Sequence, residues 1–470
     1  MVGGVSQSTS NALQRNASVW VWVLLGLFAL VAGLAGGASR YDAIQIVPLR
    51  TFSALFLVAA LYQLRAEAIK RERIVLALFG SLVLLIAIQL MPLPPEMWRH
   101  LPDRDAVFEL DVVLGLGENW RPITFAPMRT WNALASLLVP GTALLLAIAL
   151  RAPTRTLLRL IAALGAFNAF VGLLQIAGGA SSVFYFYAVT NRGAPVGVFA
   201  NENHAAVFAA CSLLVVANLW LRAREAHGAA WERLVYPMAF LLILFTALVG
   251  GSRAGFAAAV GAIAVSIAMY VLAPRPRRRG RRSQKEPIQN WFDQHPRVVL
   301  AIPLILVSLI ILAFFFLDRV PAFRDLLSGD SFEDLRWSLL PVIGEMLSHH
   351  WLIGTGFGSF EQAYHIYEPS ELLMPYYVNQ AHNDAAQFVV EGGLFAGLIL
   401  AGVLMWIARC ILRTSMGRLT NSTALFWSSI FAIVGVASVV DYPLRAPLFQ
   451  VVMIWFLVAL SQDSRGTKLA

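Results

Sequence analysis

Twelve long apolar runs constrain what this chain can fold into. A helix that spans a bilayer needs about 20 mostly apolar residues. That pattern recurs at residues 18–36, 44–63, 74–91, 132–150, 158–177, 204–221, 234–250, 255–273, 298–317, 385–408, 421–440 and 447–461. The first run lacks a small-residue cleavage site, so we interpret it as a retained helix and not as a removed signal peptide. Hydrophobic residues make up 58% of the 470 residues and charged residues 13%, against about 45–50% and about 25% in soluble domains. The sequence therefore predicts an all-α integral membrane protein with about 12 transmembrane helices.

The distribution of Lys and Arg predicts how these helices are oriented. If the N-terminus is cytoplasmic, the inner segments hold 24 of the 36 basic residues and 7 of the 27 acidic residues. Cytoplasmic loops carry an excess of Lys and Arg, so we expect both termini inside the cell. The basic run PRPRRRGRRSQK at 274–285 fits an inner loop that faces anionic membrane lipid. We expect no nucleic acid among the partners.

Cysteine, histidine and aspartate patterns predict neither a metal nor a cofactor. Cys211 and Cys410 offer no disulfide framework or zinc site, and no H-E-x-x-H motif occurs. His349 and His350 are neighbours that we expect to point apart on a helix. The D-R-D stretch at 103–105 matches the minimal D-x-D of metal-dependent glycosyltransferases, but this spacing is common by chance.

Unusual polar residues gather on the predicted outer side. They lie in NRGAPVGVFANENHAAVF (191–208), GGSRAGF (250–256), the long loop 318–384 and DYPLRAP (441–447). Within the long loop, DLRWSLLPVIGEMLSHH (334–350) repeats apolar residues at helical spacing, which predicts a helix ending before Gly354. GTGFGSF (354–360) has no preceding strand, so we interpret it as a turn and not as a phosphate loop. Asp441 and Arg445 stand four apart, which fits either an ion-paired turn or a contact to a glycan or diphosphate.

Two outer arginines are candidates for anion binding. Arg253 opens an apolar run, where a charge is costly unless it snorkels to the interface or binds a ligand. Arg336 has Glu333 and Asp334 beside it, so a local ion pair is the alternative to a ligand. Guanidinium groups suit a diphosphate because their planar fork donates two hydrogen bonds to phosphate oxygens.

A histidine stands where a polar stretch meets a predicted membrane helix. QAHNDAAQFVVEGG (380–393) sets His382, Asn383 and Asp384 directly before the run 385–408. Outside the inner membrane no nucleotide sugar is present, so an activated glycan there must be carried on lipid. A departing diphosphate needs cationic stabilisation, and an attacking sugar hydroxyl needs a base such as histidine. We expect Asn383 or Asp384 to cap the helix or orient the ring.

These motifs together resemble the O-antigen ligase and Wzy-type polymerase superfamily. The resemblance rests on GSRAGF, DLRW…HHWLIGTGFGSF (334–360) and AHNDAAQFVVEGGLFAGL (381–398), with QLMPLPPEMW (89–98), GVFANENHAAVF (197–208) and DYPLRAP, so it runs from about residue 75 to the end. It implies a GT-C-like glycosyltransferase of the bacterial inner membrane with a periplasmic active site. Transfer from undecaprenyl diphosphate would proceed with inversion and without a metal. The resemblance places Arg253 and Arg336 at the family's diphosphate-binding arginines and His382 at its catalytic histidine.

The resemblance implies a donor but leaves the acceptor open. The donor is an undecaprenyl-diphosphate-linked glycan. The acceptor is lipid A-core for a ligase and a growing glycan for a polymerase, and the motifs do not separate the two. We predict four segments: 1–73, with the first two helices; 74–250, with outer loops 92–131 and 178–203; an O-antigen ligase-like core at 251–408 that includes the outer loop 318–384; and 409–470.

One departure concerns the first outer motif, and the remaining polar residues are weaker candidates. Relatives often carry a basic residue where this chain has Glu202 in NENH, so we assign no phosphate binding to that position. Asn203 and His204 either donate hydrogen bonds to a sugar or phosphate or cap the helix that starts there. The candidate substrate contacts are Asn201, Asn203, His204, Asn383, Asp384 and Arg445.

A transporter or flippase of lipid-linked glycan is the alternative class. Twelve helices with both ends inside are also the layout of many secondary transporters. Those proteins place charges near the bilayer midplane and often show two related halves. Here the helix centres are almost free of charge and no half-to-half repeat is visible, so we favour the transferase.

Overall fold

The computed structural model describes residues 20–466 except 226–230, 251–252, 274–304, 306–330, 374–377 and 417–420. At residues 225, 233, 253–255, 331–336 and 416 only the backbone is described.

Long helices make up most of the described chain. They are Trp20–Ala35, α2 (Ile46–Gln63), α4 (Arg73–Gln89), α7 (Pro127–Ser136), α8 (Leu138–Ala149), α9 (Thr154–Gly178), α10 (Glu202–Glu225), α11 (Glu232–Val249), α12 (Arg253–Leu272), α18 (Asp384–Met416), α19 (Asn421–Val440) and α20 (Pro447–Ser464). Each predicted span within the described residues lies on one of these helices or, for 132–150, on α7 and α8. The predicted span 298–317 lies outside them.

Hydropathy and length support a membrane protein. Counting α7 and α8 as one, seven helices in the described part of the chain are long and apolar enough to cross a membrane. The prediction of a helical membrane protein is therefore confirmed. The total of about 12 spans, the inside position of both termini and the GT-C-like arrangement stay predictions.

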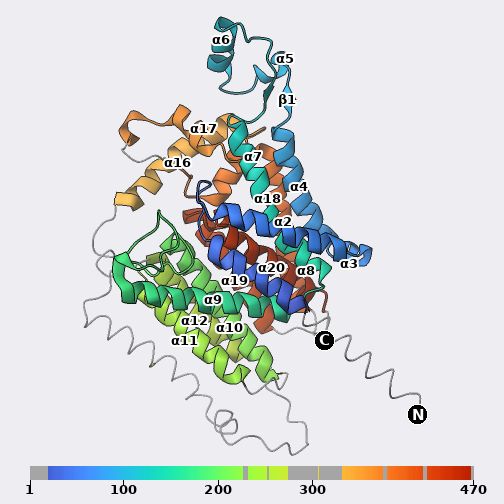
Figure 1. Cartoon of the computed structure of the whole chain (residues 1–470), viewed down its shortest axis with the longest axis vertical. Helices are drawn as coiled ribbons and strands as arrows, with labels where there is room; N and C mark the ends of the chain where they lie inside the picture. Colours follow the sequence, from blue (N-terminus) through green and yellow to red (C-terminus); the bar gives the residue numbers. More distant parts are fainter. Residues whose placement is uncertain are drawn as a thin grey trace, which may run out of the picture. The chain divides into compact units, whose positions relative to one another are not determined.

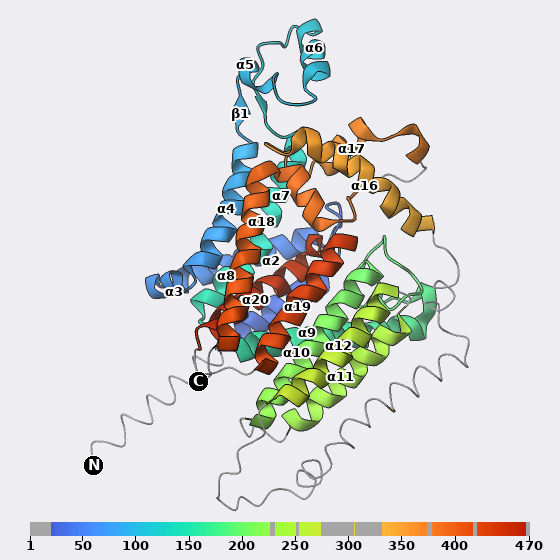
Figure 2. The same ribbon diagram turned by 180° about the vertical axis from the view of Figure 1, so that it is seen from behind.

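Contacts between Cα atoms divide the chain into two compact units. The first comprises Met1–Leu157, Asp330–Leu412 and Val434–Ala470, and the second comprises Leu158–Gly329 and Arg413–Ile433. In the first unit α8 packs against α2 and α20; it is apolar on nearly all sides and almost wholly buried, as expected for a helix of that composition. In the second unit α10 packs against α11 and α12, which lie beside it in both views (Figures 1 and 2). The four sequence segments stay a prediction.

Short elements connect the long helices. Between α4 and α7, the two-residue strands β1 (Pro92–Leu93) and β2 (Arg121–Pro122) pair antiparallel. The helices α5 (Pro95–Trp98) and α6 (Asp105–Val113) lie between these strands. The other short elements are α3 (Ala66–Arg71), α17 (Phe360–Tyr367) and the 3-10 turns η1 (Gly179–Ser181), η2 (Ser370–Leu372) and η3 (Pro443–Arg445).

The predicted helix in the long outer loop is confirmed as α16 (Ser331–His350). It packs on α17 (Figure 1). Their contact is apolar and buries Leu339, Met346, Phe360 and Tyr364 almost completely. The chain then turns at Gly354 and re-enters the helical core.

The helix α18 is broken in its N-terminal third. Gly393 adopts φ 62° and ψ −154°, which no helix contains. The carbonyls of Val390 and Glu391 therefore accept hydrogen bonds from backbone N–H groups of the turn 354–358 at 3.0 and 2.9 Å. The Gln89 side chain also donates to the Glu391 carbonyl at 2.8 Å. In a membrane a broken helix is tolerated only where the freed polar groups are satisfied in this way.

The same turn requires glycine, which gives a first prediction. Gly356 has φ +98°, and a Cβ there would lie 2.1 Å from Thr124 Oγ1. We expect Gly356→Ala to destabilise the protein by about 1–3 kcal/mol through backbone strain, with the clash in addition. Thermal unfolding in detergent measures this loss. The control is Gly344→Ala in α16, where a Cβ meets nothing within 4 Å; equal unfolding temperatures for the two variants would contradict the role given to the turn.

Candidate functional site

His382 lies directly before α18 in an unusual backbone conformation. Its φ is +49°, in the left-handed region that few residues other than glycine adopt and that histidine adopts more readily than most. Asn383 then caps the helix, since its Oδ1 accepts a hydrogen bond from the Ala386 N–H at 2.9 Å. Capping was expected of Asn383 or Asp384, and Asn383 provides it. Residues held in sparsely populated conformations cluster at functional sites.

The imidazole of His382 is held between two residues that follow α19. Its Nδ1 is buried and lies 3.7 Å from Asp441 Oδ1, and its ring meets the Tyr442 ring edge-on with centroids 4.9 Å apart. A carboxylate that faces Nδ1 favours the tautomer with the proton on that nitrogen and leaves Nε2 as the acceptor. The side chain is 24% exposed. This arrangement can serve a general base, and the sequence did not reveal Asp441 as the partner.

Arg445 contacts two carboxylates of α18, which corrects one expectation. Its Nη1 donates to Glu391 Oε2 at 3.1 Å, and its Nε lies 3.5 Å from Asp384 Oδ1. The expected ion pair with Asp441 does not form, because η3 is a short 3-10 turn and not a helix in which residues four apart would face each other. Burial opposes the charge of Arg445, but the two carboxylates outweigh it and raise its pKa above the ordinary value.

Hydrogen bonds fasten the start of α18 to the same turn. Asp384 Oδ2 accepts from the Leu444 N–H at 3.0 Å and from the Ser438 hydroxyl at 3.4 Å. Gln387 donates to Glu391 Oε1 at 3.0 Å. The carboxylate of Glu391 is fully buried. The helix that follows His382 is thereby fixed to the segment that carries Asp441.

A large cavity lies beside this network within the first unit. Its volume is about 480 Å³, and Asp384, Gln387, Glu391 and Arg445 contribute to its lining. His382 is not among the described residues that line the cavity. The expectation that the imidazole faces an outer cavity therefore stays a prediction.

The two candidate diphosphate arginines are placed by their backbones only. Arg253 is the first residue of α12, and Arg336 lies in the second turn of α16. Their side chains lie outside the described residues, as does the local ion pair considered for Arg336. Arg253 belongs to the second unit, whereas Arg336 and His382 belong to the first.

Asn201 caps α10 in the second unit. Its Oδ1 accepts hydrogen bonds from the N–H groups of Asn203 and His204 at 2.8 and 3.4 Å. Capping was considered for Asn203 and His204, and the preceding asparagine performs it. His204 is 1% exposed. The roles of these three residues as substrate contacts stay predictions.

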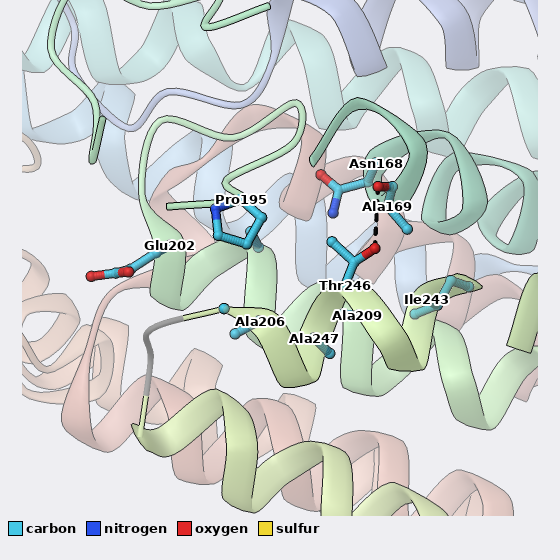
Figure 3. Close-up of a pocket in the computed structure, with 11 residues that line it drawn as sticks. Asn168, Ala169, Pro195, Glu202, Ala206, Ala209, Ile243, Thr246 and Ala247 are labelled. Atoms are coloured by element: carbon cyan, nitrogen blue, oxygen red, sulfur yellow. Dashed lines mark hydrogen bonds between the residues drawn. The ribbon is translucent and has the colours of Figure 1, made fainter. Parts of the chain in front are cut away.

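A small cavity adjoins Glu202 in the same unit. It has a volume of about 20 Å³ and is walled largely by alanine and proline side chains, which leaves room for about one water molecule. Figure 3 shows the Glu202 carboxylate pointing away from Asn168 and Thr246, whose hydroxyl donates to the Ala169 carbonyl at 3.3 Å. The cavity is too small for a sugar.

A cluster that the sequence did not predict joins the segment between α4 and α7 to α16 and α17. His350 Nε2 lies 2.9 Å from Asp103 Oδ2, and the Tyr367 hydroxyl donates to the same carboxylate. Both His349 Nδ1 and His350 Nε2 lie 3.0 Å from the Tyr367 hydroxyl. The expectation that the two histidines point apart is thus wrong, because His349 Nδ1 and His350 Nε2, at the end of α16, both approach the hydroxyl of Tyr367. Burial is the main cause that lowers the pKa of His350.

The described residues contain no group of three or more His, Cys, Asp or Glu side chains placed to hold a metal ion. Asp103 contacts the outer histidines, while Asp105 begins α6. The two aspartates of the D-R-D stretch thus have different surroundings.

A family model matches part of the chain. Residues 238–401 match the family model described as O-antigen ligase, which confirms the resemblance to the O-antigen ligase and Wzy superfamily. The match covers less than half of the chain and includes Arg253, Arg336 and His382, whereas Asp441 and Arg445 lie beyond it. A search of curated proteins finds no match.

Proposed function

We propose, from the premise that residues 238–401 match the O-antigen ligase family, that this membrane protein transfers a glycan from polyprenyl diphosphate to a sugar hydroxyl on the periplasmic side of the bacterial inner membrane. The family match supports glycan transfer in general. The observation that carries the finer proposal is the pair of His382 Nδ1 and Asp441 Oδ1, 3.7 Å apart at the mouth of α18. In this pair His382, which lies within the matched residues 238–401, is the proposed base.

In the proposed reaction, His382 acts as general base. The acceptor hydroxyl gives its proton to Nε2 while its oxygen attacks the anomeric carbon of the donor sugar. The bond from that carbon to the diphosphate oxygen breaks, and polyprenyl diphosphate leaves with the electron pair. Attack opposite to the leaving group inverts the configuration. Asp441 acts through His382 as a positioning residue, because its charge stabilises the imidazolium that forms.

The departing diphosphate requires positive charge, and we assign that role to Arg253 and Arg336. Each hydrogen bond to a charged group contributes about 1.5–3 kcal/mol, so Arg253→Ala or Arg336→Ala is expected to weaken donor binding by roughly 10-fold or more. Lysine should rescue only in part, because a point charge lacks the fork. Equilibrium binding of labelled undecaprenyl diphosphate to the purified protein measures the effect. Arg99→Ala, at an exposed outer arginine, is the control, and wild-type affinity in both variants would end the assignment.

Reconstitution tests the function directly. Purified protein in proteoliposomes receives undecaprenyl-diphosphate-linked repeat units, with lipid A-core present or absent and a chelator throughout. Polymer formed without lipid A-core identifies a polymerase, and product found only on lipid A-core identifies a ligase. Movement of the donor across the membrane without glycan transfer would instead identify the protein as a flippase. Activity that depends on a divalent ion would contradict the metal-independent mechanism.

A further inference from the structure

The cavity of the first unit is polar at one end and apolar along its length. Its polar wall includes Arg40, Arg50, Arg129 and Arg445. It also includes three carboxylates, of which Glu361 pairs with Arg129, while Asp384 and Glu391 pair with Arg445. The remaining wall consists mainly of apolar residues of α4, α18 and α20, such as Leu78, Val403, Trp406 and Leu457. This distribution matches an amphipathic ligand with one polar end.

The apolar part is long enough for a hydrocarbon chain. Val75 and Ile86 lie near opposite ends of α4, and both line the cavity. At 1.5 Å rise per residue the helix places them about 16 Å apart. The volume of about 480 Å³ falls within the range of about 300–1,000 Å³ typical of ligand pockets.

Arg50 carries a charge that no carboxylate in the described part of the chain balances. Its guanidinium donates to Asn132 Oδ1 at 2.9 Å and to the Asn132 carbonyl at 3.2 Å. Among the described residues it forms no ion pair, whereas Arg40, Arg129 and Arg445 each contact a carboxylate. A charge in a membrane helix is costly unless it is paired or reaches water. An anionic ligand in the cavity would supply the missing partner.

Arg129 offers a second donor at the same end of the cavity. Its Nη2 pairs with Glu361 at 3.1 Å, and its guanidinium lies 3.4 Å from the centre of the Tyr41 ring. Its Nη1 is buried and donates no hydrogen bond to any residue that the structure describes. Arg129 and Asn132 stand one turn apart on α7, so the unpaired donor and the partner of Arg50 share one helix. Two guanidinium groups thus have donors left for an acceptor that the protein does not provide.

We propose that this cavity binds a phosphorylated membrane lipid, with the phosphate at Arg50 and Arg129 and one hydrocarbon chain between α4, α18 and α20. A tetrahedral phosphate can accept hydrogen bonds from both guanidinium groups, while the apolar wall removes the chain from contact with water. The ligand is a bilayer phospholipid or a polyprenyl phosphate, which share this chemistry. The proposal rests on Arg50 and Arg129, not on Arg253 and Arg336, and it does not depend on glycan transfer.

Native mass spectrometry of the delipidated full chain tests the headgroup. The probes are phosphatidylglycerol, undecaprenyl phosphate, and diacylglycerol as a lipid without phosphate. We expect at least one phosphorylated lipid to bind at least 10-fold more tightly than diacylglycerol, and the tighter of the two identifies the source. Arg50→Gln should weaken that binding at least 10-fold and Arg50→Lys less, whereas Arg99→Gln should not change it. Equal binding of diacylglycerol, or wild-type affinity in Arg50→Gln, would overturn the proposal.

A second pair of variants tests where the hydrocarbon chain of the lipid binds. Val403→Trp fills the apolar part of the cavity, so bound lipid should fall several-fold. Val436→Trp places the same bulk on an α19 residue that is 67% exposed and outside the cavity, and lipid binding should persist. If the two variants bind lipid equally and unfold at equal temperatures, the hydrocarbon chain lies outside this cavity. Because binding is measured without transfer, a failed reconstitution of glycan transfer leaves this result unaffected.

Discussion

His382→Ala is expected to abolish glycan transfer while expression and donor binding stay near normal. General base catalysis contributes about 10²- to 10⁴-fold to a rate, so transfer should fall by at least about 100-fold. The physical reason is that Ala leaves no group at the N-terminal end of α18 that can accept the proton of the acceptor hydroxyl. Single-turnover transfer from undecaprenyl-diphosphate-linked glycan in proteoliposomes measures the change.

The matched control for this variant is another outer histidine. His365 is half exposed and pairs with Glu368 at 3.0 Å, so His365→Ala should retain full activity. Asp441→Asn should lower the rate less than His382→Ala and shift the acidic limb of the pH profile, because the carboxylate acts through the imidazole. Activity retained in His382→Ala would remove the base assignment but leave the family match intact.

The largest loss of stability is expected from Arg445→Leu. This change leaves the fully buried Glu391 and the nearly buried Asp384 without their cation. Breaking a buried ion pair by removing one partner costs about 3–5 kcal/mol. Thermal or denaturant unfolding in detergent should therefore show a large decrease in stability.

A double variant separates this structural role from a substrate contact. Glu391→Gln combined with Arg445→Leu removes one of the two unpaired charges, so part of the lost stability should return. The coupling energy is the effect of the double variant minus the summed effects of the two single variants, Arg445→Leu and Glu391→Gln. A role of Arg445 in substrate binding alone would instead lower activity with unchanged unfolding, which is the outcome that contradicts our expectation.

Helices were predictable from the sequence, but the partners of their polar residues were not. Most apolar runs within the described residues match a helix to within a few residues, because length and hydropathy are local properties, although α18 continues to Met416, beyond the predicted 408. The α16 helix was likewise predicted from its apolar spacing. Asp441, by contrast, faces a histidine 59 positions earlier in the chain, and no local pattern connects the two. The same holds for Tyr367 and Asp103, which bring His349 and His350 together.

Local rules also misled where backbone geometry changed within a few residues. The spacing of Asp441 and Arg445 suggests a helical pair, yet Pro443 begins a 3-10 turn that directs the arginine to α18. The break in that helix had a visible signal, since two consecutive glycines at 392 and 393 interrupt the apolar run. Its hydrogen-bond partners, Gln89 and the turn 354–358, lie too far away in sequence to be inferred.

The broken helix α18 has a consequence for the order in which the protein is made. Every group that satisfies its freed carbonyls, in α4 and in the turn 354–358, precedes it in the chain. Ribosomes release polypeptide from the N-terminus onward, so these partners have already been synthesised when Gly393 emerges. When the interrupted segment enters the bilayer, the donors for its freed carbonyls are therefore already present. These carbonyls need not be exposed to lipid without a hydrogen bond.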